Sequence, residues 1–413
     1  MLTNYFNGKS VLDLQIDEVP SSDLSLVIVI PSMNEPDLLL ALEALRSCDK
    51  ATGSVEVIII INHTAGASSQ IIETNENSYL EVRAWATIHS TAALRYYILY
   101  HPDLPSKKGG VGMARKIGMD EAARRLLMAG NEDGIIACFD ADCTCTSDYL
   151  QILTCFFKAH PGTEGVSVHF EHPLNTLDES SRAAIIHYEM HLRYFIDAQR
   201  IVNFPFAYQT VGSSMAVRAG TYIKVGGMNT RKAGEDFYFL HKVIERGAHQ
   251  DLNTTTIFPS ARQSDRVPFG TGKAVKDLLE GASFTTYNPE SFEDLRVFIG
   301  TVPKLYDATK IGFLLIEMPD SIREFLELNN FDQVQAELIN NTASLESFVK
   351  RFFRWFNAFR LMKYMHFTRD HFYPEVPMRE AVDWLFHELD IAPTDSLENR
   401  LIQLREHDKK TVY

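Results

Sequence analysis

Two almost wholly apolar runs near the N-terminus constrain the fold more than any other feature of the sequence. Residues 24–31 read LSLVIVIP and residues 55–61 read VEVIIII. Runs of this kind are typical of strands in parallel sheets, because helices cover both faces of such sheets. Two further strands are expected at 95–101 and 134–139.

Helical patterns alternate with these strands. One helix is expected to start near Pro36, since a polar cap followed by proline favours a helix start. Its apolar positions are Leu38, Leu39, Leu42 and Leu45. A second helix is expected from 112 to 129, with Gly130 just after its end. The alternation predicts an α/β fold with a mostly parallel central sheet flanked by helices.

The pattern changes after residue 148. The sequence predicts strands and helices at 165–172, 180–200, 210–219, 234–247 and 254–262. After about residue 292 the strand signals fade, and a mainly helical region is expected.

These patterns divide the chain into three parts. We expect an N-terminal extension at 1–23, an α/β domain at 24–275 and a mainly helical C-terminal region at 276–413.

Composition narrows the class of protein. The net charge of −14 disfavours a general nucleic-acid binder, which would normally be basic. The five cysteines are odd in number, so a disulfide framework is not expected and a reducing compartment fits. No apolar run approaches the ~20 residues of a membrane span. We therefore expect a soluble, cytoplasmic protein.

Two aspartates, Asp140 and Asp142, follow the strand at 134–139. Alternation along a strand points them to the same side, at the end where α/β sheets bind ligands. Two close carboxylates repel unless a cation lies beside them, and Mg²⁺ or Mn²⁺ held this way usually also binds phosphates. The alternative is a solvated turn in which Asp142 or Thr144 caps a helix.

A second acidic pair, Glu235-Asp236, opens the helix expected at 234–247. Carboxylates suit the positive end of a helix dipole, so these residues could be helix-start acids alone. The functional interpretation makes one of them a general base that takes a proton from a hydroxyl group.

The glycine-containing segment at 109–112 opens the helix at 112–129 and could cradle phosphate, although it does not match G-x-G-x-x-G. Basic residues nearby could form a surface lip for an anionic nucleotide: Lys107, Lys108, Arg115 and Lys116. Arg262 and Arg266 could contact diphosphate oxygens, or could belong to a flexible surface loop.

Taken in order, VIVIPSMNE, IIIIN, GVGMARKIG, DAD, GSSMAVRAG and GED resemble the family 2 glycosyltransferases, which have the GT-A fold. The resemblance covers about residues 24–272. It implies a GT-A catalytic domain at 24–275 that transfers a sugar from a nucleotide-diphosphate sugar, with a UDP-sugar as the default donor. The acceptor would be a hydroxyl group of a glycan, a lipid-linked molecule or a small molecule.

The resemblance also implies roles for single residues. It places Asp140 and Asp142 at the metal and ribose, with Mn²⁺ or Mg²⁺ as cofactor, and it makes Asp236 the base, with Glu235 beside it. Inversion at the anomeric carbon is the implied outcome. The nucleotide-sugar contacts would be Pro31, Asn34, Glu35, Asn62, Gly112, Arg115, Asp140, Arg262 and Arg266, and the acceptor side Gly212, Ser213 and Gly227. Asn62 stands where the family usually has aspartate.

The segment at 348–363 combines aromatic and basic residues at helical spacing. Its aromatic face could pack within the protein, contact a partner, or lie on a membrane surface, which would place the protein at the inner face of the membrane. The aromatic residues expected on this face are Phe348, Phe352, Trp355, Phe356 and Phe359.

Two other functions remain open at the level of sequence. A retaining GT-A transferase would share the D-x-D motif without the base. A non-catalytic nucleotide-sugar-binding protein would need neither base nor turnover, and the complete set of Asp140, Asp142 and Asp236 argues against it.

Overall fold

The computed structural model describes residues 5–6, 8–10, 12–262, 271–281, 284–307 and 316–411. The chain divides into two compact units. The first comprises Met1–Ile185, Thr210–Lys276 and Arg405–Tyr413, and the second comprises Ile186–Gln209 and Asp277–Leu404. The three predicted domain ranges stay a prediction.

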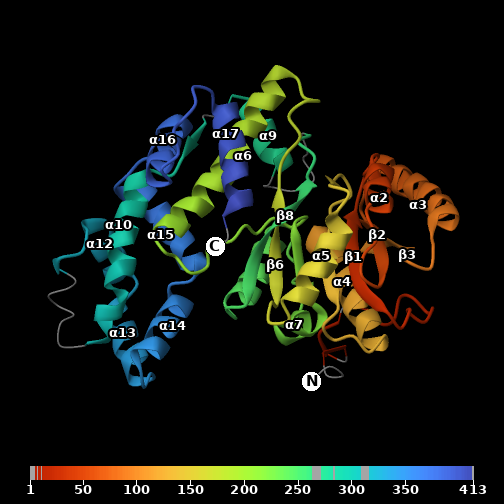
Figure 1. The fold of residues 1–413 in the computed structure, drawn as a ribbon, viewed down its shortest axis with the longest axis horizontal. Coiled ribbons are helices and arrows are strands. Elements are labelled where there is room, and N and C mark those ends of the chain that lie inside the picture. The colour runs from red at the N-terminus through yellow and green to blue at the C-terminus, as the bar shows by residue number, and fades with distance from the viewer. Residues whose placement is uncertain are drawn as a thin grey trace. The chain divides into compact units, whose positions relative to one another are not determined.

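Within the described residues, the first unit is built on an eight-stranded sheet (Figure 1). The four strands at one end, β3-β2-β1-β4, are parallel, and β6 is parallel to β8. The antiparallel pairs are β4 with β7, β6 with β7, and β5 with β8. The order along the sheet is β3 (Leu94–Leu104), β2 (Ser54–Thr64), β1 (Leu24–Ser32), β4 (Ile135–Cys138), β7 (Met215–Arg218), β6 (Gly165–Phe170), β8 (His249–Phe258) and β5 (Thr144–Cys145).

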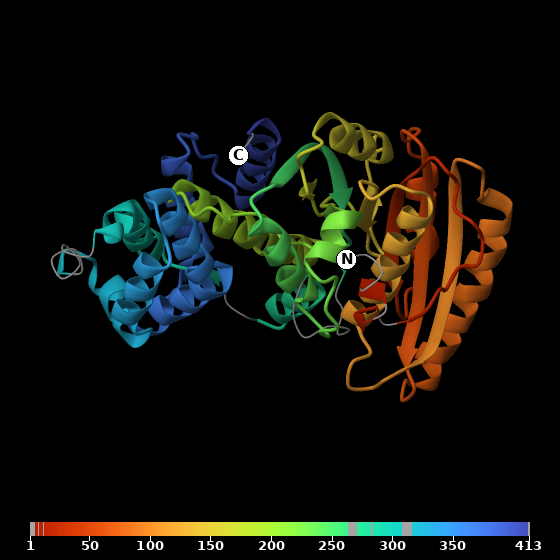
Figure 2. The same ribbon diagram turned by 90° about the horizontal axis from the view of Figure 1, so that it is seen from below.

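Helices cover both faces of the parallel strands. On one face, Leu26, Ile28 and Ile30 of β1 belong to a core shared with α2 (Leu38–Arg46), α3 (Ser69–His89) and α5 (Tyr149–Ala159). On the other face, a Cβ added to Gly118 of α4 (Val111–Met128) would lie 2.4 Å from both Val29 and Ile60. Figure 2 shows α3 and α4 on opposite sides of these strands. Covering on both faces explains why the strands are almost wholly apolar.

The predicted fold class is confirmed: a mixed α/β fold with a mostly parallel sheet and a mainly helical C-terminal region, as expected of the GT-A fold. The strands predicted at 24–31, 55–61, 95–101 and 134–139 are present as β1 to β4.

Two strand predictions are wrong in their bounds. The strand predicted at 210–219 is only Met215–Arg218, because Ser214 N donates to Val211 O in a turn and α7 (Ala219–Lys224) follows at once. The strand predicted at 254–262 is His249–Phe258, because pairing with β6 starts at His249.

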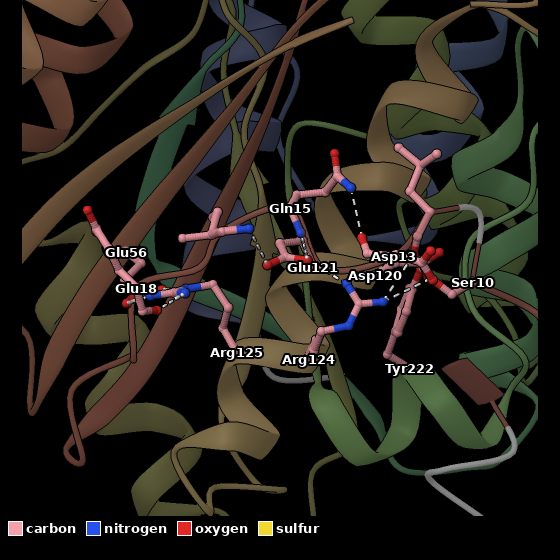
Figure 3. Close-up of polar contacts among 12 residues, drawn as sticks. Ser10, Asp13, Gln15, Glu18, Glu56, Asp120, Glu121, Arg124, Arg125 and Tyr222 are labelled. Carbon is pink, nitrogen blue, oxygen red and sulfur yellow. Dashed lines mark hydrogen bonds and ion pairs between the residues drawn. The ribbon is translucent and has the colours of Figure 1, made fainter. Parts of the chain in front are cut away.

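The N-terminal segment lies along α4 (Figure 3). Tyr5 and Tyr222 both donate to Asp120 Oδ1 at 2.6 Å. Ile16 N donates to Glu121 Oε1 at 3.2 Å. Since Tyr222 belongs to α7, these bonds fasten the segment to α4 and α7 together.

In its described residues, the second unit is mainly helical, with a short pair of strands (Figure 1). α6 (Glu179–Ile201) begins in the first unit, and α17 (Leu397–Lys410) ends in it. The other elements are α10 (Pro289–Thr301), η1 (Val302–Tyr306), α12 (Asp320–Leu328), α13 (Phe331–Asn340), α14 (Leu345–Trp355), α15 (Ala358–His371), α16 (Met378–Glu388), β9 (Thr285–Thr286) and β10 (Val376–Pro377).

The aromatic segment at 348–363 is not a single helix, because α14 ends at Trp355 and α15 starts at Ala358. Phe348, Phe352 and Phe356 are fully buried, and the Phe352 ring lies 5.6 Å from that of Phe298. These aromatic side chains therefore pack within the second unit. Among the described helices, none is long and apolar enough to cross a membrane.

Candidate active site

The candidate site lies where the order of the strands reverses. From β1 the chain goes to β2 and β3 on one side, and β4 then pairs on the other side of β1. Open α/β sheets bind ligands at this switch point, outside the carboxyl ends of the strands. Predicted site residues lie near the carboxyl ends of β1 and β2 and in the segments that follow β1 and β4.

Arg115 on α4 joins two of the acidic motifs. Its Nη2 lies 2.5 Å from Asp140 Oδ1, and its Nη1 donates to Glu235 Oε1. The side chain is 4% exposed. A Cβ on Gly212 would lie 2.3 Å from Nη1, and one on Gly112 would lie 3.0 Å from Glu235 Cβ, so both glycines leave room for this contact. The structure thus brings together five residues that the sequence assigns to a site.

Charge and burial shift the pKa values of these side chains. Burial would lower the pKa of Arg115, but the carboxylates of Asp140 and Glu235 raise it well above its usual value. Burial raises the pKa of Glu235 and that of Asp236, and Arg115 opposes both shifts. Asp236 lies in the first turn of α8 (Glu235–Ile244), and its Oδ1 accepts from Phe237 N at 2.8 Å. A carboxylate with a raised pKa is a stronger base than an ordinary aspartate.

A second arginine, Arg262, joins the end of β1 to the D-x-D motif. Its Nη2 donates to Glu35 Oε2 and lies 3.3 Å from Asp142 Oδ2. Its Nη1 lies 3.3 Å from Asp37 Oδ2. Glu35 is 1% exposed, so Arg262 supplies a counter-ion to a buried carboxylate.

Each aspartate of the motif therefore has an arginine beside it. The positive charges of Arg115 and Arg262 offset the repulsion between Asp140 and Asp142 without a metal. Arg266 lies outside the described residues.

The acidic pair still suits a hard cation. The side chains of Asp140 and Asp142 are 35% and 23% exposed. The described residues contain no group of three or more histidine, cysteine, aspartate or glutamate side chains that could hold a metal alone. Mg²⁺ and similar ions usually bind one or two carboxylates and complete their shell with water and substrate phosphates. The two carboxylates fit an ion that arrives with a diphosphate.

Three asparagines connect the ends of β1 and β2. Asn34, at φ +52°, donates its N–H to Asn75 Oδ1 at 2.8 Å. Asn75 Nδ2 donates to the backbone carbonyl of Asn62 at 2.9 Å. Asn62 Nδ2 donates to the carbonyls of Ser32 and Ile60, at 3.1 and 3.3 Å, which leaves its Oδ1 as the acceptor. Asn75 is not expected from the sequence, because it lies in a polar helix without a recognisable motif.

Other residues predicted for the site are buried or closely packed. Pro31 is buried and pairs with Ile60, and Ser213 is 2% exposed. Gly227, at φ +71°, approaches Tyr5, and an added Cβ would lie 1.9 Å from the Tyr5 hydroxyl. The acceptor-side roles of Gly212, Ser213 and Gly227 stay predictions.

The predicted basic lip is wrong for two of its four residues. Arg115 and Lys116 are only 3% and 6% exposed. Lys116 Nζ lies 3.2 Å from Asp120 Oδ2, one helical turn further along α4. Both cations are held inside the protein by carboxylates, whereas Lys107 and Lys108 are exposed.

No family model matches the chain, and no curated protein matches it. Solved structures similar to it include S. aureus TarS 1-349 in complex with UDP-GlcNAc, at TM-score 0.42 and 12% identity over 81% of this chain and 92% of that one. The same protein in complex with UDP gives TM-score 0.42 and 11% identity over the same shares. S. aureus TarS gives TM-score 0.38 and 14% identity over 75% and 53%. These likenesses are too distant to indicate an activity, which has to come from the chemistry of the site.

Proposed function

We propose that this chain is a glycosyltransferase that moves a sugar from a nucleotide-diphosphate sugar to an acceptor hydroxyl. One observation carries the proposal: at the topological switch point, Arg115 joins Asp140 to the Glu235-Asp236 pair. A carboxylate suited to a cation and diphosphate thus lies near a carboxyl group suited to general-base catalysis.

Asp236 is the proposed base. It would take the proton of the acceptor hydroxyl while the hydroxyl oxygen attacks the anomeric carbon and the bond to the diphosphate breaks. Attack from the face opposite the leaving group inverts the anomeric carbon. Arg115 favours the ionised forms of Glu235 and Asp236, which burial disfavours.

The leaving diphosphate needs positive charge. Asp142, with Asp140 beside it, would hold Mn²⁺ or Mg²⁺, which when bound would offset the charge of the diphosphate. Arg262 contacts Asp142 and Glu35, and we expect its guanidinium to bind diphosphate oxygens when the donor is present.

The nucleotide contacts are proposed at the ends of β1 and β2. Because Asn62 Nδ2 is used by backbone carbonyls, Asn62 presents an oxygen to a ligand, as aspartate would. An oxygen acceptor at this position favours a base that offers an N–H, such as uracil, and so supports a UDP-sugar. Asn34 and Glu35 adjoin the same edge.

Asp236→Asn tests the proposal, in an assay of UDP release from UDP-sugars with Mn²⁺ or Mg²⁺. General-base catalysis is worth about 10²–10⁴-fold, so turnover should fall by that factor while UDP binding is retained. Glu290→Gln is the matched control, since Glu290 is an exposed acid in the first turn of α10, and it should change nothing. Undiminished turnover in Asp236→Asn rules out the base. Binding without turnover in the wild type favours a binding protein, and failure to bind any nucleotide sugar removes the proposal.

A further inference from the structure

Cys48 and Cys145 lie in contact although they are 97 positions apart, with their Sγ atoms 3.6 Å from each other. Cys48 follows α2, and Cys145 lies in β5, three residues after Asp142. Both side chains are partly buried. Neither takes part in the chemistry proposed for the site.

The backbone already holds the two segments together. Asp49 N, one residue after Cys48, donates to Ser147 O at 2.6 Å. The Cys48 thiol also lies 3.8 Å from the carbonyl of Thr146. A disulfide has an S–S length of about 2.05 Å, so the sulfurs must approach by roughly 1.5 Å. Because the flanking backbones are bonded, this approach brings no distant segments together.

We propose that Cys48 and Cys145 form an intramolecular disulfide by exchange with a small-molecule disulfide such as oxidised glutathione. The Cys48 thiolate attacks one glutathione sulfur, and the other glutathione leaves as a thiolate. The Cys145 sulfur then attacks Cys48 Sγ in the mixed disulfide, and its proton goes to the departing second glutathione. Two protein thiols are oxidised, and one small disulfide is reduced to two thiols.

The pKa shifts of the two thiols indicate which sulfur attacks glutathione first. The hydrogen bond with Cys145 lowers the pKa of Cys48, and the same contact raises the pKa of Cys145. These shifts favour Cys48 as the nucleophile and Cys145 as the resolving thiol. Cys138 and Cys143 are fully buried, which raises the pKa of each and protects it.

The bond would change the surroundings of the candidate site. It would join the segment that follows Asp142 to the C-terminal end of α2. Glu35 and Asp37 lie just before the N-terminal end of the same helix. Asp142, Glu35 and Asp37 all contact Arg262. Since the bond closes a long loop, it would also restrict the unfolded chain and raise the melting temperature.

The test uses the full, reduced chain, incubated with oxidised glutathione, alkylated and mapped by peptide mass spectrometry. The matched control is Cys155→Ser, because Cys155 is exposed and lies against Thr52. Wild type and Cys155→Ser should both give a Cys48–Cys145 linked peptide, carry no glutathione on either residue, and melt at a higher temperature than their reduced forms. Cys145→Ser should retain one glutathione on Cys48, and Cys48→Ser should give no linked peptide.

Two results overturn the proposal: wild type that keeps glutathione on Cys48 without cross-linking, or wild type whose Cys48 and Cys145 both stay reduced. Neither measurement depends on enzymatic activity, so the result stands apart from the proposed function.

Discussion

Replacing Arg115 by methionine should destabilise the first unit strongly. Methionine has a similar length but no charge, so it removes the counter-ion of a glutamate, Glu235, that is only 2% exposed. Breaking a buried ion pair from one side costs about 3–5 kcal/mol, because the remaining charge is left buried. Asp140 is 35% exposed, and loss of its pair should add at most about 1 kcal/mol. We therefore expect Arg115→Met to lower the free energy of unfolding by about 3–5 kcal/mol.

A second substitution separates loss of the pair from loss of packing. In Arg115→Met/Glu235→Gln the buried charge is gone, so the double variant should be at least about 1 kcal/mol more stable than additivity predicts. Urea unfolding followed by circular dichroism gives the free energies. Arg323→Met is the control, since Arg323 pairs with Asp320 at the surface, and it should change stability by less than about 0.5 kcal/mol. If Arg115→Met behaves like this control, or the two substitutions are additive, the buried pair does not hold the site together.

Three further predictions follow from the same structure. Burial raises the pKa of Asp236, so the acidic fall in kcat/KM should have an apparent pKa above the ordinary aspartate value of about 3.9. A pH–rate profile measures this pKa, and an apparent pKa at or below about 3.9 contradicts the assignment of Asp236 as the base. Burial would raise the pKa of Glu171, but hydrogen bonds and ion pairs with His169, Lys409 and Arg405 lower it to about 2 from 4.5. The ionised Glu171 therefore stabilises the folded protein above pH 4.5, and this stabilisation is lost as the pH falls toward 2. Glu171→Gln should therefore cost about 2–3 kcal/mol at pH 7 and flatten the acid dependence measured by denaturant unfolding; an unchanged acid transition would refute this. Gly212→Ala should lower turnover and melting temperature, because its Cβ would lie 2.3 Å from Arg115, whereas Gly162→Ala, with nothing within 4 Å, should lower neither; equal effects of the two would contradict the packing.

The sequence predicts the parallel strands well because burial on both faces leaves almost no choice of residue. The central runs of β1 and β2, Val27–Ile30 and Val57–Ile61, are apolar throughout, so both strands are visible from the sequence pattern alone. α3 was not predicted, because it buries mostly small or polar side chains and lacks an apolar stripe. The ends of β7 and β8 depend on a turn and on pairing with β6, and neither is visible locally.

The acidic motifs of the site could be found from the sequence, but the connections between them could not. Arg115 and Glu235 are 120 positions apart, and nothing near either residue indicates the pair. Lys116 is different, because Asp120 follows it by four positions on a helix. That spacing favours an ion pair, and it could have argued against placing Lys116 in a surface lip.

The most direct test of the proposed site is a titration of the wild-type chain with UDP, with and without Mn²⁺, followed by calorimetry. The site predicts that Mn²⁺ tightens UDP binding in the wild type and that Asp142→Asn removes this dependence on the metal. Absence of UDP binding, or the same metal dependence in Asp142→Asn as in the wild type, would contradict a diphosphate site at the carboxyl edge of β4.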